Sequence, residues 1–141
     1  MAMNNSKVVV PGLAAGVVAN IIGFVGFGLL SGPRFQAEAA AVAPSLQGQG
    51  TTGGAIAVNV IATFVVGILL VWLYAAIRPR FGPGMKTAFY AAAVVWICGF
   101  LFHLDMLNLG MMTAATYAMA SIVALVQVVA SAGVGGMLYK E

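Results

Sequence analysis

Charged side chains are scarce in this chain, and their absence from long stretches is its most informative feature. Only 6% of the 141 residues are charged, whereas soluble domains carry roughly 25%. Four stretches contain no charge at all, and they cover residues 8–33, 39–77, 87–104 and 106–139. Each is long enough to hold a membrane-crossing helix of ~20 apolar residues. Together with a mean hydropathy of +1.06, this pattern excludes a water-soluble domain.

Cysteine and histidine occur once each, as Cys98 and His103. A single cysteine excludes an intrachain disulfide, a CxxC redox pair and a thiolate zinc cage. His103 and Asp105, the one acidic residue within or near a span, are too few to form a convergent set of metal ligands. The chain also lacks a Ser/His/Asp or Cys/His set, a phosphate-binding glycine loop and an HExxH motif. We therefore expect no catalytic residue, no metal site and no enzymatic activity.

The apolar stretches predict an all-α membrane protein, a compact antiparallel bundle of four transmembrane helices in a single domain. We place the helices at residues 8–30, 55–77, 86–109 and 112–138. The first stretch is too long for the core of a signal peptide, so we expect it to remain as a helix. Ser31-Gly32-Pro33 is expected to end it, before a long outer loop with a helix-prone segment at RFQAEAAAVA. Phe81-Gly82-Pro83-Gly84 is expected to form a tight, non-helical turn.

The six basic residues lie at the ends of the apolar stretches, which indicates membrane orientation and argues against nucleic-acid binding. With four crossings, five of them fall on the side of the termini: Lys7, Arg78, Arg80, Lys86 and Lys140. The other side holds only Arg34, partly offset by Glu38. The positive-inside rule therefore predicts cytoplasmic termini, with Arg78, Arg80 and Lys86 as a cytoplasmic anchor.

Small residues at four-residue spacing are expected to let the helices approach closely, because lipid provides no hydrophobic drive for association. The pairs are Gly12/Gly16, Ala19/Gly23, Ala88/Ala92, Ala114/Ala118, Ala120/Ala124 and Ala132/Gly136. Large side chains would then point to lipid or to a partner protein: Phe24, Phe27, Phe64, Trp72, Phe100 and Phe102.

Polar side chains within the spans are the candidates for function, because burying them in hydrocarbon is costly without a partner. Asn20 and Gln127 lie near the centres of the first and fourth helices, and we interpret them as a mid-membrane amide pair that either fixes helix register by interhelical hydrogen bonds or lines a solute path. A second, outer layer contains Asn59, His103, Asp105 and Asn108.

His103 is open to three interpretations: a hydrogen-bonded structural histidine, an axial ligand to haem or a chlorophyll-type pigment, or a proton-relay or pH-sensing group. Asp105 follows two positions later, about 200° around the helix, so the two side chains do not share a face. Asp105 either points into the outer headgroup layer or forms a cation or proton site.

The stretches WLYAAIRPRFGPGMKTA, GLAAGVVANIIGF and GGMLYKE resemble a group of small four-helix bacterial membrane proteins without an assigned activity. The likeness covers nearly the whole chain, and the Arg-Pro-Arg-Phe-Gly-Pro-Gly turn is its most specific part. It implies the same fold and topology and a place in the bacterial inner membrane. Many of those proteins carry an acidic residue near the position of Gln127, so by this likeness a proton-linked role is not expected at Gln127.

Two classes of function fit these features. The first is an accessory or structural subunit of a larger membrane assembly, which packs against protein partners and binds lipid or pigment at an aromatic face. The second is a small transporter or channel that forms homo-oligomers around Asn20, Gln127 and the outer polar layer. Binding of haem or pigment through His103 is a third alternative; otherwise we expect no cofactor.

Overall fold

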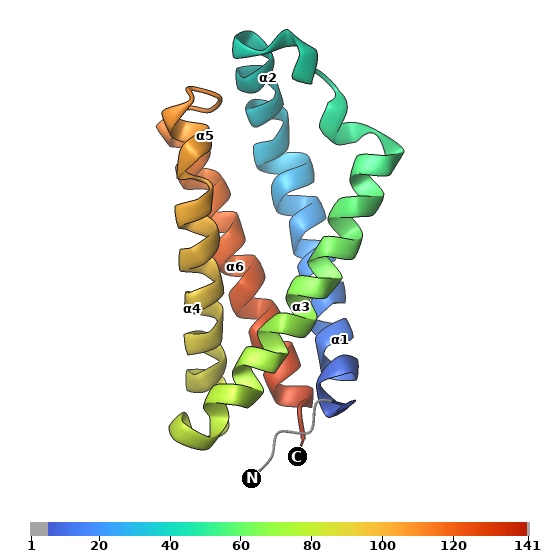
Figure 1. Ribbon diagram of the computed structural model, residues 1–141, viewed down its shortest axis with the longest axis vertical. Helices are drawn as coiled ribbons and strands as arrows, with labels where there is room; N and C mark the ends of the chain where they lie inside the picture. Colours follow the sequence, from blue (N-terminus) through green and yellow to red (C-terminus); the bar gives the residue numbers. More distant parts are fainter. Residues whose placement is uncertain (1–5, 141) are drawn as a thin grey trace.

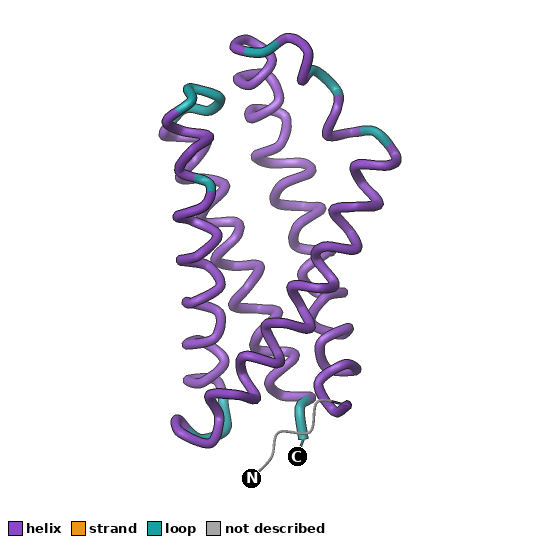
Figure 2. Tube along the Cα trace, viewed as in Figure 1, coloured by secondary structure: helices purple, strands orange, loops and turns teal. Residues whose placement is uncertain are grey.

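The computed structural model describes residues 6–140, and the described part of the chain is helical apart from short connections (Figures 1 and 2). The longer elements are α1 (Ser6–Gly23), α3 (Gly53–Phe81), α4 (Met85–Phe102) and α6 (Ala114–Leu138), and α1 continues through the π-helix η1 (Phe24–Ser31) into α2 (Gly32–Val42). Shorter elements are η2 (Pro44–Leu46), η3 (Gln49–Thr51) and α5 (Leu104–Asn108).

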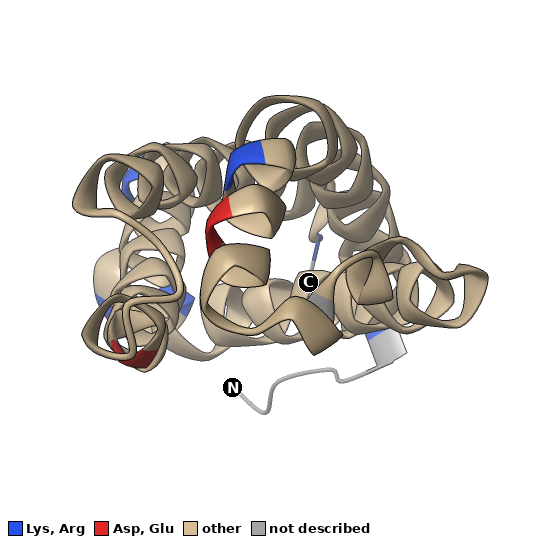
Figure 3. Ribbon diagram, turned by 90° about the horizontal axis from the view of Figure 1, so that it is seen from above, with Lys and Arg blue, Asp and Glu red and all other residues tan. Residues whose placement is uncertain are grey.

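In the described part of the chain, four helical segments are long and apolar enough to cross a membrane: Lys7–Val42, Gly53–Phe81, Met85–Asn108 and Ala114–Leu138. This confirms the all-helical, four-span prediction. The segments alternate in direction, so the start of α1 and the end of α6 lie at one end of the bundle, which we call the terminal end (Figure 1). We call the opposite end, which carries α2 and α5, the loop end. Charged residues are few and scattered when the bundle is viewed from the loop end (Figure 3).

The first helix does not end at Ser31-Gly32-Pro33, so that prediction is wrong. It continues through the π-helical η1 into α2 and ends at Val42. The Ser31 hydroxyl donates to the Gly26 carbonyl five residues earlier, at 3.2 Å. A Cβ on Gly32 would collide with the carbonyl oxygen of Phe27, so this wide turn requires glycine there. The π turn allows the helix to pass Pro33, which has no N–H to donate and falls in the first turn of α2.

Other helix ends also differ from the prediction. Arg78, Pro79, Arg80 and Phe81 belong to α3, because the helix continues through Pro79. The tight turn is confirmed at Gly82–Gly84, where Gly82 has φ of 81° and Gly84 has φ of 122°, values that L side chains rarely adopt. The third span is divided at His103, between α4 and α5. The fourth begins at Ala114, after the N-cap Thr113.

The core lies in the terminal half of the bundle, where small residues bring backbones together. A Cβ on Gly67 would lie 2.6 Å from the Gly16 nitrogen and 2.7 Å from the Gly12 carbonyl oxygen. The Gly12/Gly16 pair therefore forms the crossing of α1 and α3, as predicted. Buried alanines join α4 to α6 beside this crossing: Ala88, Ala91, Ala92 and Ala132.

Towards the loop end, α3 leans away from α4 and α6 (Figure 1), and the buried hydrophobic cluster lies in the terminal half. Two of the predicted small-residue pairs do not join helices there. Ala114 and Ala118 are exposed, and Ala120 and Ala124 line a cavity. Their spacing matches that of Gly12 and Gly16, but one pair is exposed and the other lies at the cavity wall.

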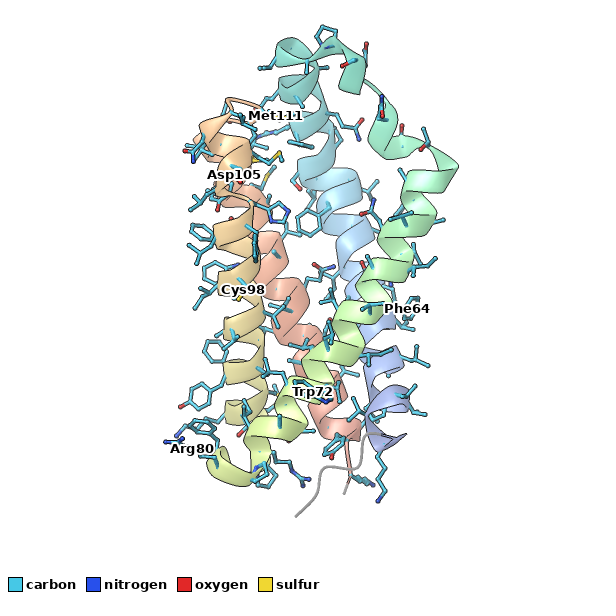
Figure 4. The ribbon with its side chains drawn as sticks, in the orientation of Figure 1. Phe64, Trp72, Arg80, Cys98, Asp105 and Met111 are labelled. Atoms are coloured by element: carbon cyan, nitrogen blue, oxygen red, sulfur yellow. The ribbon has the colours of Figure 1, made fainter. Side chains whose placement is uncertain are left out.

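The large side chains behave in two ways. Phe24, Trp72 and Phe102 are exposed, at 68%, 45% and 82% of their surface, as predicted. Phe27, Phe64 and Phe100 are half-buried inside the bundle, so the prediction is wrong for them. Figure 4 places Phe64 and Trp72 along α3, Arg80 at the terminal end, and Asp105 and Met111 at the loop end.

Candidate functional site

A cavity of about 440 Å³ lies between α3, α4 and α6 in the loop half of the bundle. We call it the loop-half cavity. Asn59, Thr63 and Val66 of α3 contribute to its lining, at spacings of four and three residues. Trp96 and Phe100 of α4 and His103 after it follow the same helical periodicity, as do Tyr117, Ala120, Ala124 and Gln127 of α6. Each helix thus presents one face to the cavity.

A smaller space of about 150 Å³ adjoins the loop-half cavity on the side of the core. Asn59, Thr63 and Gln127 line both spaces. The smaller one reaches Leu70 and Ser131, which are each 1% exposed. The two spaces therefore extend from the loop end to the packed core and end against it.

Asn59 is exposed on α3, and its amide is oriented by its own helix. The Asn59 Nδ2 donates to the Ala55 carbonyl at 3.0 Å. A carbonyl only accepts hydrogen bonds, so the atom facing Ala55 is nitrogen, and the Asn59 Oδ1 is the other end of the amide. Thr63 donates to the Asn59 backbone carbonyl at 2.8 Å.

Gln127 reaches from α6 to α1, where its Nε2 donates to the Ala19 carbonyl at 2.8 Å. A Cβ on Gly23 would lie 2.7 Å from this nitrogen, so glycine makes room for the amide. This is the interhelical bond that the sequence predicted. Its partner is a backbone carbonyl, however, and not Asn20: the Asn20 Nδ2 donates to the Gly16 carbonyl at 2.9 Å and more weakly to the Val60 carbonyl at 3.5 Å. Asn20 and Gln127 therefore do not form an amide pair.

His103 lies at the junction of α4 and α5 and is exposed. Its Nδ1 lies 2.7 Å from the Gly99 carbonyl oxygen. Because that oxygen only accepts, Nδ1 carries the hydrogen, and Nε2 of the neutral ring is an acceptor. Asp105 and Asn108 are exposed on α5 and do not line the cavity. The outer polar layer is therefore divided, with only Asn59 and His103 at one site.

An aromatic wall on α4 and α6 was not predicted as part of the site. The Trp96 Nε1 donates to the Ser121 carbonyl at 2.8 Å, and the Tyr117 hydroxyl donates to the Phe100 carbonyl at 2.5 Å. The Phe100 ring lies 5.5 Å from that of Trp96 and 5.1 Å from that of Tyr117. The spacing of Trp96, Phe100 and His103 by four and three residues was the signal available in the sequence.

Glu38 on α2 binds the first turn of α6, a contact that the sequence did not reveal. Its Oε2 accepts from the Thr113 backbone N–H at 2.7 Å. Its Oε1 accepts from the hydroxyls of Thr113 at 3.0 Å and Thr116 at 2.8 Å. A carboxylate is favourable at a helix N-terminus because the first backbone N–H groups have no partner within the helix. Glu38 therefore fastens the extension of the first helix to the fourth.

The predicted cytoplasmic anchor lies at the terminal end, where each of its cations lies over an aromatic ring. Arg78 is 5.6 Å from the centroid of Tyr139, Arg80 is 5.9 Å from that of Phe81, and Lys86 is 5.9 Å from that of Tyr90. Cation–π contacts of this kind are typical of membrane interfaces, where a cationic tip lies next to an apolar ring. The structure therefore gathers these three cations in one layer.

Within residues 6–140, no group of three or more His, Cys, Asp or Glu side chains is placed to hold a metal ion. Comparison of the chain with protein-family models, curated proteins and solved structures found no match. The resemblance to small bacterial membrane proteins stays a prediction. Arguments about function therefore rest on the geometry of the cavity and of the helix surfaces.

Proposed function

We propose that this protein is a non-catalytic integral membrane protein that serves as an accessory subunit of a larger membrane assembly. The observation that carries the proposal is the position of α3. Every residue from 53 to 62 is exposed except Ala55, which is half-buried. Helices associate in lipid through van der Waals contact, and α3 loses this contact with its own bundle over its loop half. In this proposal, a transmembrane helix of a partner subunit packs against the exposed surface of α3 and supplies the missing contact.

Site-directed crosslinking tests this proposal. In a Cys98→Ser background, single cysteines at Val58 and Ile61 report on the loop half of α3, and one at Val94 reports on α4; all three positions are exposed. We expect a photoactivatable crosslinker in native membranes to join α3, but not α4, to one larger subunit in stoichiometric amounts. A lone, monodisperse protein with no crosslink at either α3 position would overturn the proposal; a crosslinked homodimer would assign the surface to a second copy.

Orientation belongs to the same proposal. The chain lies in the bacterial inner membrane with its terminal end in the cytoplasm and its loop end outside. The support is the layer of Arg78, Arg80 and Lys86 at the terminal end, since basic residues are retained on the cytoplasmic side.

A second candidate function is a small transporter that works as an oligomer. The observation in its favour is the polar lining shared by the two adjoining cavities, with Asn59, Thr63 and Gln127 in both. Flux in proteoliposomes is then expected to be lost in Gln127→Leu and retained in Asn20→Leu, because Asn20 lies outside both linings. Equal flux in wild type and Gln127→Leu would remove this candidate. An absorbance scan of the same preparation tests for haem or pigment at His103.

A further inference from the structure

The chemistry of the loop-half cavity identifies a class of ligand, independently of the partner proposed above. Its volume of about 440 Å³ falls within the ~300–1,000 Å³ typical of small-molecule sites. A transmembrane helix is far larger than this space. The lining side chains Asn59 and His103 are exposed, so the cavity opens on the surface of the bundle. Both belong to segments that can cross a membrane, so a ligand enters from the lipid.

Hydrogen-bond donors around the cavity are directed at backbone carbonyls. Trp96, Tyr117 and Ser121 donate to Ser121, Phe100 and Tyr117, respectively. Asn59, Gln127 and the His103 Nδ1 donate in the same way to Ala55, Ala19 and Gly99. The groups that remain are three acceptors, the Asn59 Oδ1, the Gln127 Oε1 and the His103 Nε2, together with the second N–H of the Asn59 and Gln127 amides. A ligand that satisfies the acceptors supplies at least one O–H or N–H donor. A hydroxyl, which both donates and accepts, can serve both kinds of group.

The absence of charge narrows the class of ligand further. Among the described residues, no Lys, Arg, Asp or Glu lines the loop-half cavity. With the His103 ring neutral, a charged ligand would have no counter-charge there, and burial of an unpaired charge in a bilayer is very costly. The remaining walls are aromatic and aliphatic, including Phe27, Val95 and Val128. The site therefore suits an uncharged molecule with a small hydrogen-bonding head and a hydrocarbon body.

We propose that the loop-half cavity binds a neutral membrane amphiphile with a hydroxyl head, whose O–H donates to Asn59, Gln127 or His103 while its hydrocarbon body lies against Trp96 and Phe100. A diacylglycerol, a long-chain or isoprenoid alcohol and a quinol all have this chemistry. Trp96 lines the cavity, whereas Trp72 lies on α3 outside it and is 45% exposed. The two tryptophans thus report separately on the site and on bulk lipid.

Quenching by a brominated diacylglycerol in lipid nanodiscs tests the proposal. Trp72→Phe leaves Trp96 as the only tryptophan, and Trp96→Phe leaves Trp72. We expect quenching of Trp96 to saturate, with its midpoint at a mole fraction about tenfold or more below that of Trp72. The same lipid with its hydroxyl methylated is expected to quench both tryptophans alike. Equal midpoints for the two tryptophans, or equal quenching of Trp96 by the methylated lipid, would overturn the proposal.

Variants localise the effect to the cavity. Asn59→Leu and Gln127→Leu each remove an acceptor and are expected to raise the Trp96 midpoint roughly three- to tenfold. Asn20→Leu removes an amide outside the cavity and is expected to leave it unchanged.

Because Gln127→Leu also breaks the bond to Ala19, a second pair of variants avoids the polar groups. Ala124→Leu fills the cavity and is expected to abolish saturable quenching, while Ala118→Leu on the exposed face of the same helix does not; the same midpoint in both would refute the site.

Mass spectrometry of the lipids that are extracted with the gently purified protein shows which kind of hydroxyl lipid occupies the cavity. Enrichment of a diacylglycerol, an alcohol or a quinol over the surrounding membrane supports the proposal, and enrichment of none contradicts it.

Discussion

At the scale of single residues, the stability of the bundle depends most on positions where two backbones touch. Gly67 faces Gly12 and Gly16 across the crossing of α1 and α3, and the atoms that a Cβ would meet are backbone atoms. A flexible side chain can move away from a new methyl group, but a backbone cannot without separating the helices. Gly99 on α4 is also helical, yet nothing lies within 4 Å of the position of its Cβ.

We therefore expect Gly67→Ala to destabilise the protein by about 1–3 kcal/mol, through overpacking at the crossing. Gly99→Ala is the matched control and is expected to be neutral or slightly stabilising, since alanine favours helix more than glycine does. Thermal unfolding of the two purified variants in the same detergent measures the difference. Equal melting temperatures would show that the helices do not cross at Gly67.

Tyr139 offers a second test at this scale, because its ring and its hydroxyl are expected to contribute differently to the stability of the protein. The ring packs edge-on against Tyr74 at 6.2 Å, and the side chain is 3% exposed. Its buried hydroxyl has no hydrogen-bond partner among the described residues. Tyr139→Phe retains the ring and removes the unsatisfied group, so we expect stability to rise by about 1 kcal/mol.

The control is Tyr117→Phe, which removes a hydroxyl that donates to Phe100. We expect it to lower stability by about 1 kcal/mol. Unfolding curves measured side by side compare the two hydroxyls directly. If both variants lose stability equally, the Tyr139 hydroxyl has a partner in the membrane-embedded protein.

The sequence showed which residues are candidates for function, but not which residues they contact in the fold. Asn59, His103 and Gln127 were recognisable as functional candidates because polar side chains are rare in apolar helices. Their shared cavity was not, since it depends on the angle at which α3 leaves the bundle. Asn20 has the same chemistry as Gln127, but only the fold places it outside the cavity. The bond between Glu38 and Thr113 joins residues 75 positions apart, and no local pattern predicts such a contact.

At the scale of elements, hydropathy predicted the four spans, and prolines misled the prediction of their ends. Ser31-Gly32-Pro33 was expected to end the first helix and the second helix was placed at residues 55–77, yet Pro33 and Pro79 both lie within continuous helices. For Pro33, the π turn of η1 and the absence of a side chain at Gly32 let the backbone pass. The consequence is a first helix long enough to place Glu38 against α6.

The Glu38 contact is therefore expected to control the order of α2. Glu38→Gln retains the shape of the side chain but removes the charge that the α6 N-terminus favours. We expect amide hydrogen exchange in α2 and in the first turn of α6 to accelerate, while exchange in α3 and α4 is unchanged. Gln36→Ala on the same helix is the control. Unaltered protection of α2 in Glu38→Gln would show that this carboxylate does not hold the two elements together.

At the scale of the whole molecule, one end of the bundle is closely packed and the other is open. The packed terminal half contains the buried core, and the loop half contains the cavity. The basic layer of Arg78, Arg80 and Lys86 lies at the packed end. If the positive-inside rule sets orientation here, the packed end faces the cytoplasm, and the cavity opens in the outer leaflet.

This orientation gives the last prediction. Green fluorescent protein fused to the C-terminus is expected to be fluorescent, because this reporter folds in the cytoplasm. Alkaline phosphatase inserted at Gly50 is expected to be active, because this enzyme folds outside the cytoplasm. The number of basic residues near the helix ends determines which side of the membrane they occupy, so moving basic residues from one end of the bundle to the other must change the two reporter signals. Arg80→Ser with Lys86→Ser, combined with Ser45→Lys, Gln47→Lys and Gln49→Lys in the η2–η3 segment, is expected to lower both signals and produce an inverted population. The same two serine substitutions with glutamate at the three loop positions form the control, since acidic residues contribute little to orientation. An unchanged pair of signals in the lysine variant would mean that helix packing, and not the basic layer, decides which end of the bundle faces the cytoplasm.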